Sequence, residues 1–316
     1  MTPVAELADR LRHELAKTIV GQAACIDELL VALFAGGHVV IEGVPGLAKT
    51  LLAKSLALAI DATFTRIQFT PDLMPGDVTG ANVLDMAENR FNLVKGPVFT
   101  QVLLADEINR TPPKTQAALL EAMQERQVTI DGRRHALGDF FFVIATQNPI
   151  EYEGTYPLPE AQIDRFLLKA LIDYPAAAQE VDVLKKHNAG LDPADIASAG
   201  IVKALTVEQL LAARTGLRSV RVDDGLYDYI VRIVGGTRVH HHLTLGASPR
   251  ASLAFLQAAK VVAAMRGRDF VTPDDVKQMA RPVLRHRLIL KPEAEIEGIS
   301  ADDIVEQVLA EVEIPR

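Results

Sequence analysis

The sequence predicts an α/β fold, with a mostly parallel sheet in the first part of the chain and a helical region after it. Up to Tyr174, short strand-like apolar segments alternate with helix-like ones, which is typical of strands joined by crossover helices. A glycine-rich turn joins the first of these strands to a helix, and after Tyr174-Pro175 the alternation stops. We therefore expect two domains, over residues 1–174 and 175–316.

The elements of the first domain follow from hydrophobic periodicity. Apolar residues recur at helical spacing before and after the glycine-rich turn. Other segments are rich in apolar residues, and two are near-continuous runs typical of strands covered on both faces. The expected helices are Val4 to Lys17, Ile26 to Phe34 and Thr50 to Ile60, and the expected strands are His38 to Glu42, Thr63 to Phe69, Gln101 to Ala105, Asp139 to Thr146 and Arg165 to Ile172.

Two segments interrupt this alternation, and we expect both to be insertions on the core sheet. Ala81 to Lys95 contains two short extended pieces around a polar stretch. Gln127 to Leu137 carries Asp131-Gly132 between extended pieces, which is a strong hairpin signal.

The second domain is predicted to be all helical because signals for helix starts recur in it. Thr206 has a glutamine three residues later, which forms a capping-box pattern. Ser248 and Thr272 are each followed by proline, the combination of an N-cap and a favourable first helical residue.

Composition narrows the class of protein. The chain has 316 residues, of which 49% are apolar and 23% charged, so a chain without a packed core is excluded. The net charge of −8 argues against broad, non-specific binding of nucleic acid. The single cysteine, Cys25, excludes an internal disulfide and fits a reducing compartment. No segment is typical of a membrane span or a signal peptide, so we expect a cytoplasmic protein.

The strongest chemical signal is the turn Gly43-Val-Pro-Gly-Leu-Ala-Lys-Thr50 between a predicted strand and a predicted helix. Glycines let backbone N–H groups surround phosphates, and the helix N-terminus adds positive charge. Lys49 would contact the β- and γ-phosphates of a nucleotide, and the Thr50 hydroxyl would ligate Mg²⁺. Ala48 replaces the usual last glycine, and we expect it to adopt helical dihedrals. A simple glycine turn before a core helix is the alternative. The candidate nucleotide-binding residues are Gly43, Val44, Pro45, Gly46, Leu47, Ala48, Lys49, Thr50 and Leu51.

Polar residues at the ends of two other strands fit the same site. The strand from Gln101 ends in Asp106-Glu107, where the first acid could hold the Mg²⁺ water shell and the second could polarise an attacking water. Asn148 follows another strand and could orient water or contact the γ-phosphate. Because strands of an open α/β sheet present ligand sites at their carboxyl ends, we expect these groups to converge.

Two arginines complete the candidate catalytic set. Arg165 follows a loop at the end of the first domain, and Arg250 lies in the first turn of a lid helix. An arginine near a γ-phosphate stabilises transition-state charge. Either residue taken alone is more typical of a surface salt bridge.

These segments together resemble the AAA+ ATPases and, more narrowly, the MoxR family. The resemblance covers nearly the whole chain, and Ala48 is normal for that family. The segments that carry it are Ile19 to Gln22, Gly43 to Thr50, Gln68 to Asp77, Ala105 to Arg110, Leu119 to Glu125, Ala145 to Pro149, Leu158 to Phe166 and Ser248 to Arg250.

The resemblance implies a P-loop NTPase core of five parallel strands with a helical lid, assembled into a ring, usually a hexamer, with nucleotide between subunits. It implies that Val20 and Gly21 pack the adenine, and that the two inserted segments face the pore or a partner. The roles implied for the remaining residues are phosphate and Mg²⁺ binding for Lys49, Thr50 and Asp106, catalytic base for Glu107, first sensor for Asn148, second sensor closing the lid over the nucleotide for Arg250, and arginine finger reaching the neighbour's site for Arg165.

The resemblance also implies a function, with ATP and Mg²⁺ as cofactors. We expect a chaperone-like motor that remodels, activates or inserts a metal into a protein client, together with a partner that carries a von Willebrand factor A domain. A nucleic-acid motor is the alternative, although nucleic acid is disfavoured by the acidic balance and the few tyrosines. A subunit that binds ATP with negligible turnover is a third possibility, against which Glu107 argues. The basic cluster Arg281, Arg285, His286 and Arg287 is expected to be a solvated face or a subunit contact.

Overall fold

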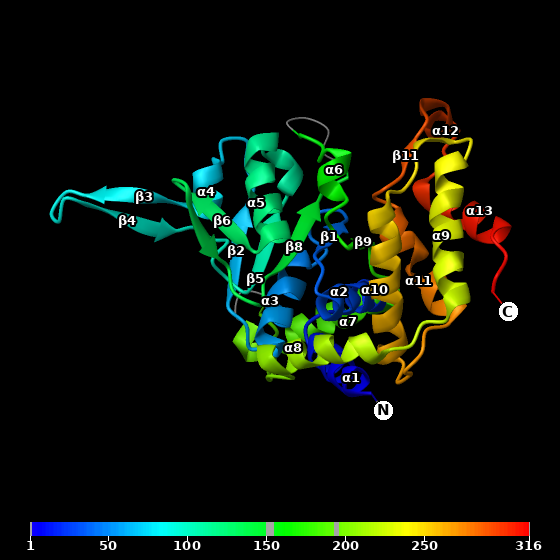
Figure 1. Ribbon diagram of the computed structural model, residues 1–316. Coiled ribbons are helices and arrows are strands. Elements are labelled where there is room, and N and C mark those ends of the chain that lie inside the picture. The colour runs from blue at the N-terminus through cyan, green and yellow to red at the C-terminus, as the bar shows by residue number, and fades with distance from the viewer. Residues whose placement is uncertain (1, 150–154, 193–195, 316) are drawn as a thin grey trace.

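The computed structural model describes residues 2–149, 155–192 and 196–315. Its first part is built on a five-stranded sheet with the order β2-β5-β8-β1-β9 (Figure 1). Every neighbouring pair in this sheet is parallel, which confirms the predicted α/β class. The strands are β1 (Val39–Glu42), β2 (Phe64–Gln68), β5 (Val102–Asp106), β8 (Phe142–Gln147) and β9 (Leu168–Leu171).

The two faces of the sheet pack into two separate cores because successive strand residues point to opposite sides. In β1, Val39 and Ile41 join the core that includes the first three helices, whereas Val40 joins the core beneath α5. Each fully buried aliphatic side chain of this kind contributes about 1.5–3 kcal/mol to the free energy of unfolding. The helices on the two faces are α1 (Pro3–Leu15), α2 (Ala23–Ala35) and α3 (Lys49–Ala59) on one side, and α4 (Pro75–Thr79) and α5 (Pro113–Glu125) on the other.

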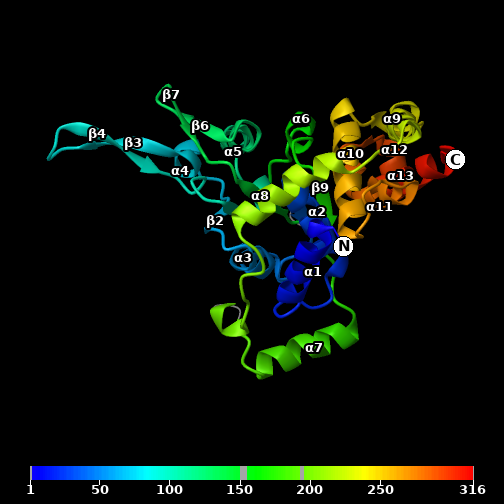
Figure 2. The same ribbon diagram turned by 60° about the horizontal axis from the view of Figure 1, so that its bottom comes forward.

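Two antiparallel hairpins stand out from the sheet, as the sequence predicted (Figure 2). The turn of the second hairpin uses Asp131 and Gly132, with φ angles of 46° and 76°, which is the left-handed pair that a tight hairpin requires. The first hairpin exposes apolar side chains, including Met86 at 85% and Phe91 at 70% exposure. The hairpin strands are β3 (Gly80–Asp85) with β4 (Arg90–Lys95), and β6 (Gln127–Ile130) with β7 (Arg133–Ala136).

The C-terminal region is mainly helical, as expected. The predicted N-caps Thr206, Ser248 and Thr272 each precede a helix. A short antiparallel ribbon, β10 (Leu243–Leu245) with β11 (Ile289–Leu290), lies among these helices. The sequence did not predict it because two or three residues are too few to show an alternating pattern. The helices of this region are α7 (Ala177–Asn188), α8 (Val207–Gly216), α9 (Asp224–Val239), α10 (Pro249–Met265), α11 (Pro273–Leu284), α12 (Pro292–Ile296) and α13 (Ala301–Glu311), with 3₁₀ turns at Ile196–Ala199 and Leu217–Ser219. Within the first part of the chain, a 3₁₀ turn at Ile108–Arg110 follows β5 and the short helix α6 (Glu160–Ile163) precedes β9.

The helices after the sheet do not form one block. In Figure 2, α7 lies away from α9 to α13, on the side of α1. Helix α8 returns to α2, where the Arg214 guanidinium donates to the carbonyl oxygen of Leu33 at 2.7 and 3.0 Å. The division of the chain near residue 174 stays a prediction. Within the described ranges, no helix combines the length and apolar character that crossing a bilayer requires.

Candidate nucleotide site

The glycine-rich turn joins β1 to α3. Gly43 must be glycine because a Cβ there would lie 2.5 Å from the carbonyl oxygen of Ile172. Gly46 and Ala48 have φ angles of 85° and 59°. The expectation of helical dihedrals at Ala48 was therefore wrong, and the left-handed conformation costs an alanine about 1–2 kcal/mol. Helix α3 begins at Lys49 without a side-chain cap from Ala48, which leaves its first N–H groups suited to an anion.

Lys49 links the helix to the ends of two strands. Its Nζ donates to the carbonyl oxygen of Gly43 at 2.6 Å and to that of Gln147 at 3.4 Å. These carbonyl groups follow β1 and end β8, respectively. The ammonium group is therefore held where the carboxyl ends of parallel strands meet, which is the ligand-binding edge of such a sheet.

Asp106 ends β5, and donors from both neighbouring strands hold its carboxylate. The Thr146 hydroxyl of β8 donates to Oδ1 at 2.5 Å. From β2, the Arg66 guanidinium donates to Oδ2 through Nε at 3.0 Å and Nη2 at 2.8 Å. A carboxylate offers about four acceptor positions. The three donors therefore occupy three of these positions, and the Asp106 carboxylate keeps one acceptor position for a further contact.

Glu107 adopts a left-handed backbone conformation with φ of 57°, which is uncommon for a residue with a side chain and often marks a functional position. Its N–H donates to the Thr146 hydroxyl oxygen at 2.8 Å. Its Oε2 accepts from Gln68 Nε2 at 2.6 Å and lies 3.2 Å from Arg110 Nε. The side chain of Glu107 is thus oriented by contacts from β2 and from the turn that follows β5.

A cavity of about 720 Å³ lies over these groups. It is lined by the glycine-rich turn, by the acidic end of β5, by the segment around Val20, by Tyr174 and by residues of α7. We call it the loop pocket. The predicted residues that line it are Val20, Pro45, Gly46, Leu47, Ala48, Lys49, Thr50, Leu51, Asp106, Glu107 and Asn148.

The remaining predicted residues do not line the loop pocket. Gly43 and Val44 lie in the same turn, and Gly21 follows Val20, so these three remain close to it in the chain. Arg165 and Arg250, by contrast, line a different cavity of about 320 Å³ between α5 and α10. The resemblance implied that Arg250 closes the lid over the nucleotide. In this structure Arg250 does not line the pocket of its own chain.

We call the surface around this second cavity the arginine face. Arg165 Nη1 donates to the carbonyl oxygen of Leu120 in α5 at 2.9 Å. Arg250 is exposed near the start of α10. His38 also lines the cavity; its ring lies 3.2 Å from the carbonyl oxygen of Met123 and accepts from the N–H of Val143 at 3.0 Å. Burial lowers the pKa of His38 from 6.5 to about 4, so at neutral pH the ring is uncharged.

Sequence reasoning missed several residues that shape the loop pocket. Arg66 and Gln68 hold the two acids. Gln68 begins one of the segments that carry the family resemblance, but neither residue was assigned a role from the sequence. Their signal was the alternation of polar residues along β2, the strand that pairs with the acid-bearing β5. Glu180, Val183 and His187 line the pocket from α7, and their spacing along one helix face was visible in the sequence.

Comparisons with known proteins agree with this geometry. Residues 38–168 match the family described as "ATPase family associated with various cellular activities (AAA)", and residues 235–308 match "AAA lid domain". An uncharacterized protein of Bacillus subtilis, YeaC, is 47% identical over 96% of this chain and 93% of its own. Chaperone MoxR1 of Mycobacterium tuberculosis is 43% identical over 98% of this chain and 82% of its own. The crystal structure of a candidate ATPase from Cytophaga hutchinsonii is 40% identical with a TM-score of 0.89, and covers 99% of this chain and 97% of its own.

Proposed function

This chain belongs to the MoxR family of AAA+ ATPases and hydrolyses ATP, and we propose that it uses this hydrolysis to remodel a protein client. The observation that carries the proposal is the loop pocket, where a lysine, a threonine and two strand-end carboxylates line one cavity. The 43% identity to a protein named a chaperone supports a protein client.

In the proposed mechanism, the glycine-rich turn and Lys49 bind the phosphates of ATP. The first N–H groups of α3 and the Lys49 ammonium provide the positive charge that a triphosphate needs. The Thr50 hydroxyl and the Asp106 carboxylate would hold Mg²⁺, since both line the pocket and hard oxygen ligands suit this ion. When bound, the ion neutralises charge on the phosphates. Val20 and Gly21 would pack the base.

Glu107 is the proposed catalytic base. Its carboxylate lies in the pocket beside Asn148, which would contact the γ-phosphate or the attacking water. Gln68 and Arg110 occupy Glu107 Oε2, so that oxygen must exchange a donor before it accepts a proton from water. The contacts with Gln68 and Arg110 thus orient the Glu107 carboxylate and slow proton transfer to this oxygen.

The arginine face would complete the pocket of a neighbouring protomer. Arg165 and Arg250 line one cavity on this chain, separate from the loop pocket. Neither arginine lines the loop pocket of its own chain, which supports a role for both at the pocket of another copy. This supports a closed ring, which we propose to be a hexamer with Arg165 as the arginine finger and Arg250 as a second sensor acting in trans.

The exposed apolar side chains of the β3–β4 hairpin support contact with a client or a partner. Met86 and Phe91 are among the most exposed large apolar side chains of the chain, and such exposure marks interaction sites. We propose a client complex whose partner protein carries a von Willebrand factor A domain, with metal insertion as one form of the remodelling. The proposed cytoplasmic location rests on the single, buried Cys25.

A pair of substitutions tests this function. Lys49→Ala should weaken ATP binding by more than about 100-fold, because the charge-assisted contact of the ammonium group with phosphate is lost. Glu107→Gln should bind ATP within about twofold of wild type but hydrolyse it about 10² to 10⁴ times more slowly. Calorimetric titration measures the binding and phosphate release measures the turnover, with Lys203→Ala as a control at an exposed ion pair.

The client is tested with the same variants. In the presence of ATP, Glu107→Gln should retain a client complex from cell extract that Lys49→Ala does not retain. Rapid hydrolysis by Glu107→Gln would show that Glu107 is not the catalytic base. Salt-dependent binding of single-stranded DNA together with DNA-stimulated hydrolysis would favour the alternative of a nucleic-acid motor.

A further inference from the structure

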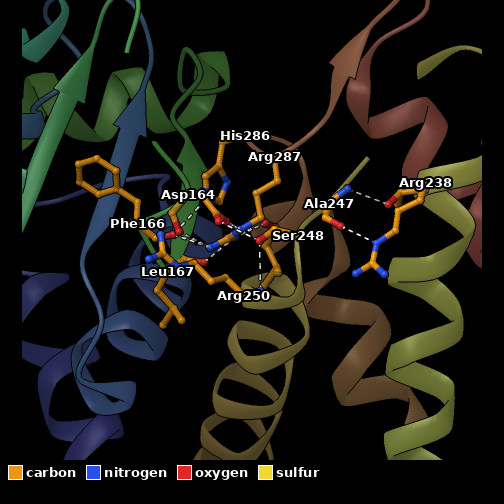
Figure 3. A network of polar contacts seen from close by, with 11 residues as sticks. Asp164, Phe166, Leu167, Arg238, Ala247, Ser248, Arg250, His286 and Arg287 are labelled. Atoms are coloured by element: carbon orange, nitrogen blue, oxygen red, sulfur yellow. Dashed lines mark hydrogen bonds and ion pairs between the residues drawn. The ribbon is translucent and has the colours of Figure 1, made fainter. Parts of the chain in front are cut away.

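Arg287 is buried against the main chain that precedes β9, whereas the sequence led us to expect a solvated face or a subunit contact for its cluster. Its side chain is 3% exposed. The guanidinium donates to Asp164 Oδ1 at 2.6 Å, to the carbonyl oxygens of Asp164 and Phe166 at 3.2 and 2.7 Å, and to that of Leu167 at 3.2 Å. It also donates to the carbonyl oxygen of Val283 in α11. Figure 3 shows this network.

The two residues before Arg287 contact the same stretch of chain. The His286 ring lies 3.1 Å from the carbonyl oxygen of Phe166, and Arg285 donates to that of Lys169 at 3.3 Å while it pairs with Asp302. His286 is 7% exposed, and burial lowers its pKa well below the ordinary value. Three consecutive side chains after α11 therefore hold the segment from residue 164 to residue 169.

Asp164 connects this segment to the start of α10. Its Oδ1 accepts from Arg287, and its Oδ2 accepts from the Ser248 hydroxyl at 2.8 Å. The same Ser248 oxygen accepts from the N–H of Arg250 at 3.1 Å. Asp164 directly precedes Arg165 in the chain. One carboxylate thus bridges the backbone positions of both arginines of the arginine face.

The Ser248 end of this bridge is also fixed from α9. Arg238 Nε donates to the carbonyl oxygen of Ala247 at 2.9 Å, and the N–H of Ala247 donates to the Thr237 hydroxyl oxygen at 3.0 Å. A Cβ on Gly246 would lie 2.6 Å from the Arg238 backbone, so this turn packs tightly against α9. These contacts fix the N-cap of α10 relative to α9.

We propose that Asp164 and Arg287 form a positioning pair that holds Arg165 and Arg250 side by side, so that the two arginines enter the neighbouring protomer's pocket as one unit. This inference rests on the proposed function, in which both residues act in trans. Neither member of the pair lines the loop pocket. A lysine at position 287 keeps the charge but cannot reproduce the planar, multiple donation of the guanidinium. Arg287→Lys should therefore displace the arginines without removing them.

Mixed rings test the pair, because they separate the protomer that offers the pocket from the one that offers the arginines. Lys49→Ala protomers keep intact arginines, and Arg165→Ala protomers keep intact pockets. Their mixture should recover ATP hydrolysis. Arg287→Lys added to the Lys49→Ala protomer should reduce the recovered rate by at least about tenfold, because small displacements of a catalytic group are costly. The same substitution added to the Arg165→Ala protomer should leave the rate within about twofold.

This asymmetry is what a merely structural role would not produce. Equal losses with Arg287→Lys in either protomer would overturn the pair as a positioning device. Failure of the parent mixture to recover activity in verified mixed rings would instead overturn the trans arrangement, and this inference with it. Arg281→Lys is the matched control, since Arg281 lies in α11, six residues before Arg287, in an exposed pair with Glu306; it should change neither mixture.

Asp164→Asn provides a second route if Arg287→Lys does not fold, as judged by circular dichroism and thermal unfolding. Asparagine keeps the shape of the side chain but removes the charge that both Arg287 and Ser248 contact. In the Lys49→Ala protomer it should again lower the recovered rate by at least about tenfold, while ATP binding by the isolated Asp164→Asn protein stays within about twofold of wild type. Full recovery with Asp164→Asn in that position would contradict the proposal.

Discussion

The loop pocket and the arginine face are built in opposite ways. The proposed catalytic groups of the loop pocket lie on the glycine-rich turn, at the start of α3 and at the ends of β5 and β8, so each of their motifs is one continuous stretch of sequence. The arginine face depends on an ion pair between Asp164 and Arg287, which lie 123 positions apart. Its arginines stand on a short turn and on a lid helix. One site is thus local in sequence, and the other exists only after the lid has packed.

Under the proposed function, each protomer would carry halves of two sites rather than one whole site. Phosphate-binding and acidic groups line one cavity, and the arginines line another. Substitutions on the two sides should therefore fail in different ways. We expect changes in the loop pocket to alter binding or chemistry within a protomer, and changes on the arginine face to act on a neighbour.

We expect the largest effect from Arg165→Ala. A loss of nucleotide affinity in this variant would contradict the separation of the arginine face from the loop pocket. We expect kcat for ATP hydrolysis to fall by about 10³-fold or more, because an arginine finger acts on transition-state charge. The affinity of isolated protomers for ATP should stay within about twofold, since the residue does not line the loop pocket. Steady-state kinetics and calorimetry measure the two quantities.

Arg133→Ala, at the exposed hairpin, is the control for this experiment. A large loss of ATP affinity in Arg165→Ala protomers would place the arginine at its own chain's pocket.

The next prediction concerns the free energy of unfolding, which should depend on pH through His38 of the arginine face. The folded pKa of His38 on the arginine face is about 4, below its ordinary 6.5, so as pH falls below 6.5 the unfolded chain binds a proton that the folded chain does not. Stability from this group is complete above about pH 6.5 and declines toward pH 4. We expect it to account for a loss of about 2 kcal/mol between pH 7 and 5.

Denaturant unfolding of wild type and His38→Gln at both pH values measures this loss. The variant should be less stable at pH 7 but should depend less on pH, by about 2 kcal/mol. An unchanged pH dependence in the variant would show that the buried imidazole does not titrate as described.

The smallest expected effect concerns the contact between Gln68 and Glu107 at the loop pocket. Gln68→Ala removes the donor 2.6 Å from Glu107 Oε2, and we expect basal hydrolysis to rise about two- to tenfold, the worth of one ordinary hydrogen bond. Phosphate release at saturating ATP measures the rate, and Lys203→Ala at the exposed ion pair with Asp61 is the control. A fall in the rate would mean that Gln68 holds Glu107 in its reactive position instead.

Much of the loop pocket was predictable because its parts are contiguous. A strand, a glycine-rich turn and a helix specify the geometry around Lys49 locally, and the rule that parallel strands present their carboxyl ends together brings Asp106 to it. The left-handed Ala48 was not predicted, because a sequence pattern does not reveal which residue of a turn carries the unusual dihedral. Arg66 and Thr146 were also missed, since their contacts with Asp106 depend on strand order and register.

The amino-acid sequence by itself determined the fold class, the strand-end acids and the two inserted hairpins, because periodicity, turn chemistry and short motifs act over a few residues. Only the tertiary structure decided that the arginines lie away from this chain's own pocket, and that His286 and Arg287 are buried and not solvated. The physical reason is that the environment of a long polar side chain is set by which distant carbonyl and carboxylate groups packing brings within hydrogen-bond distance.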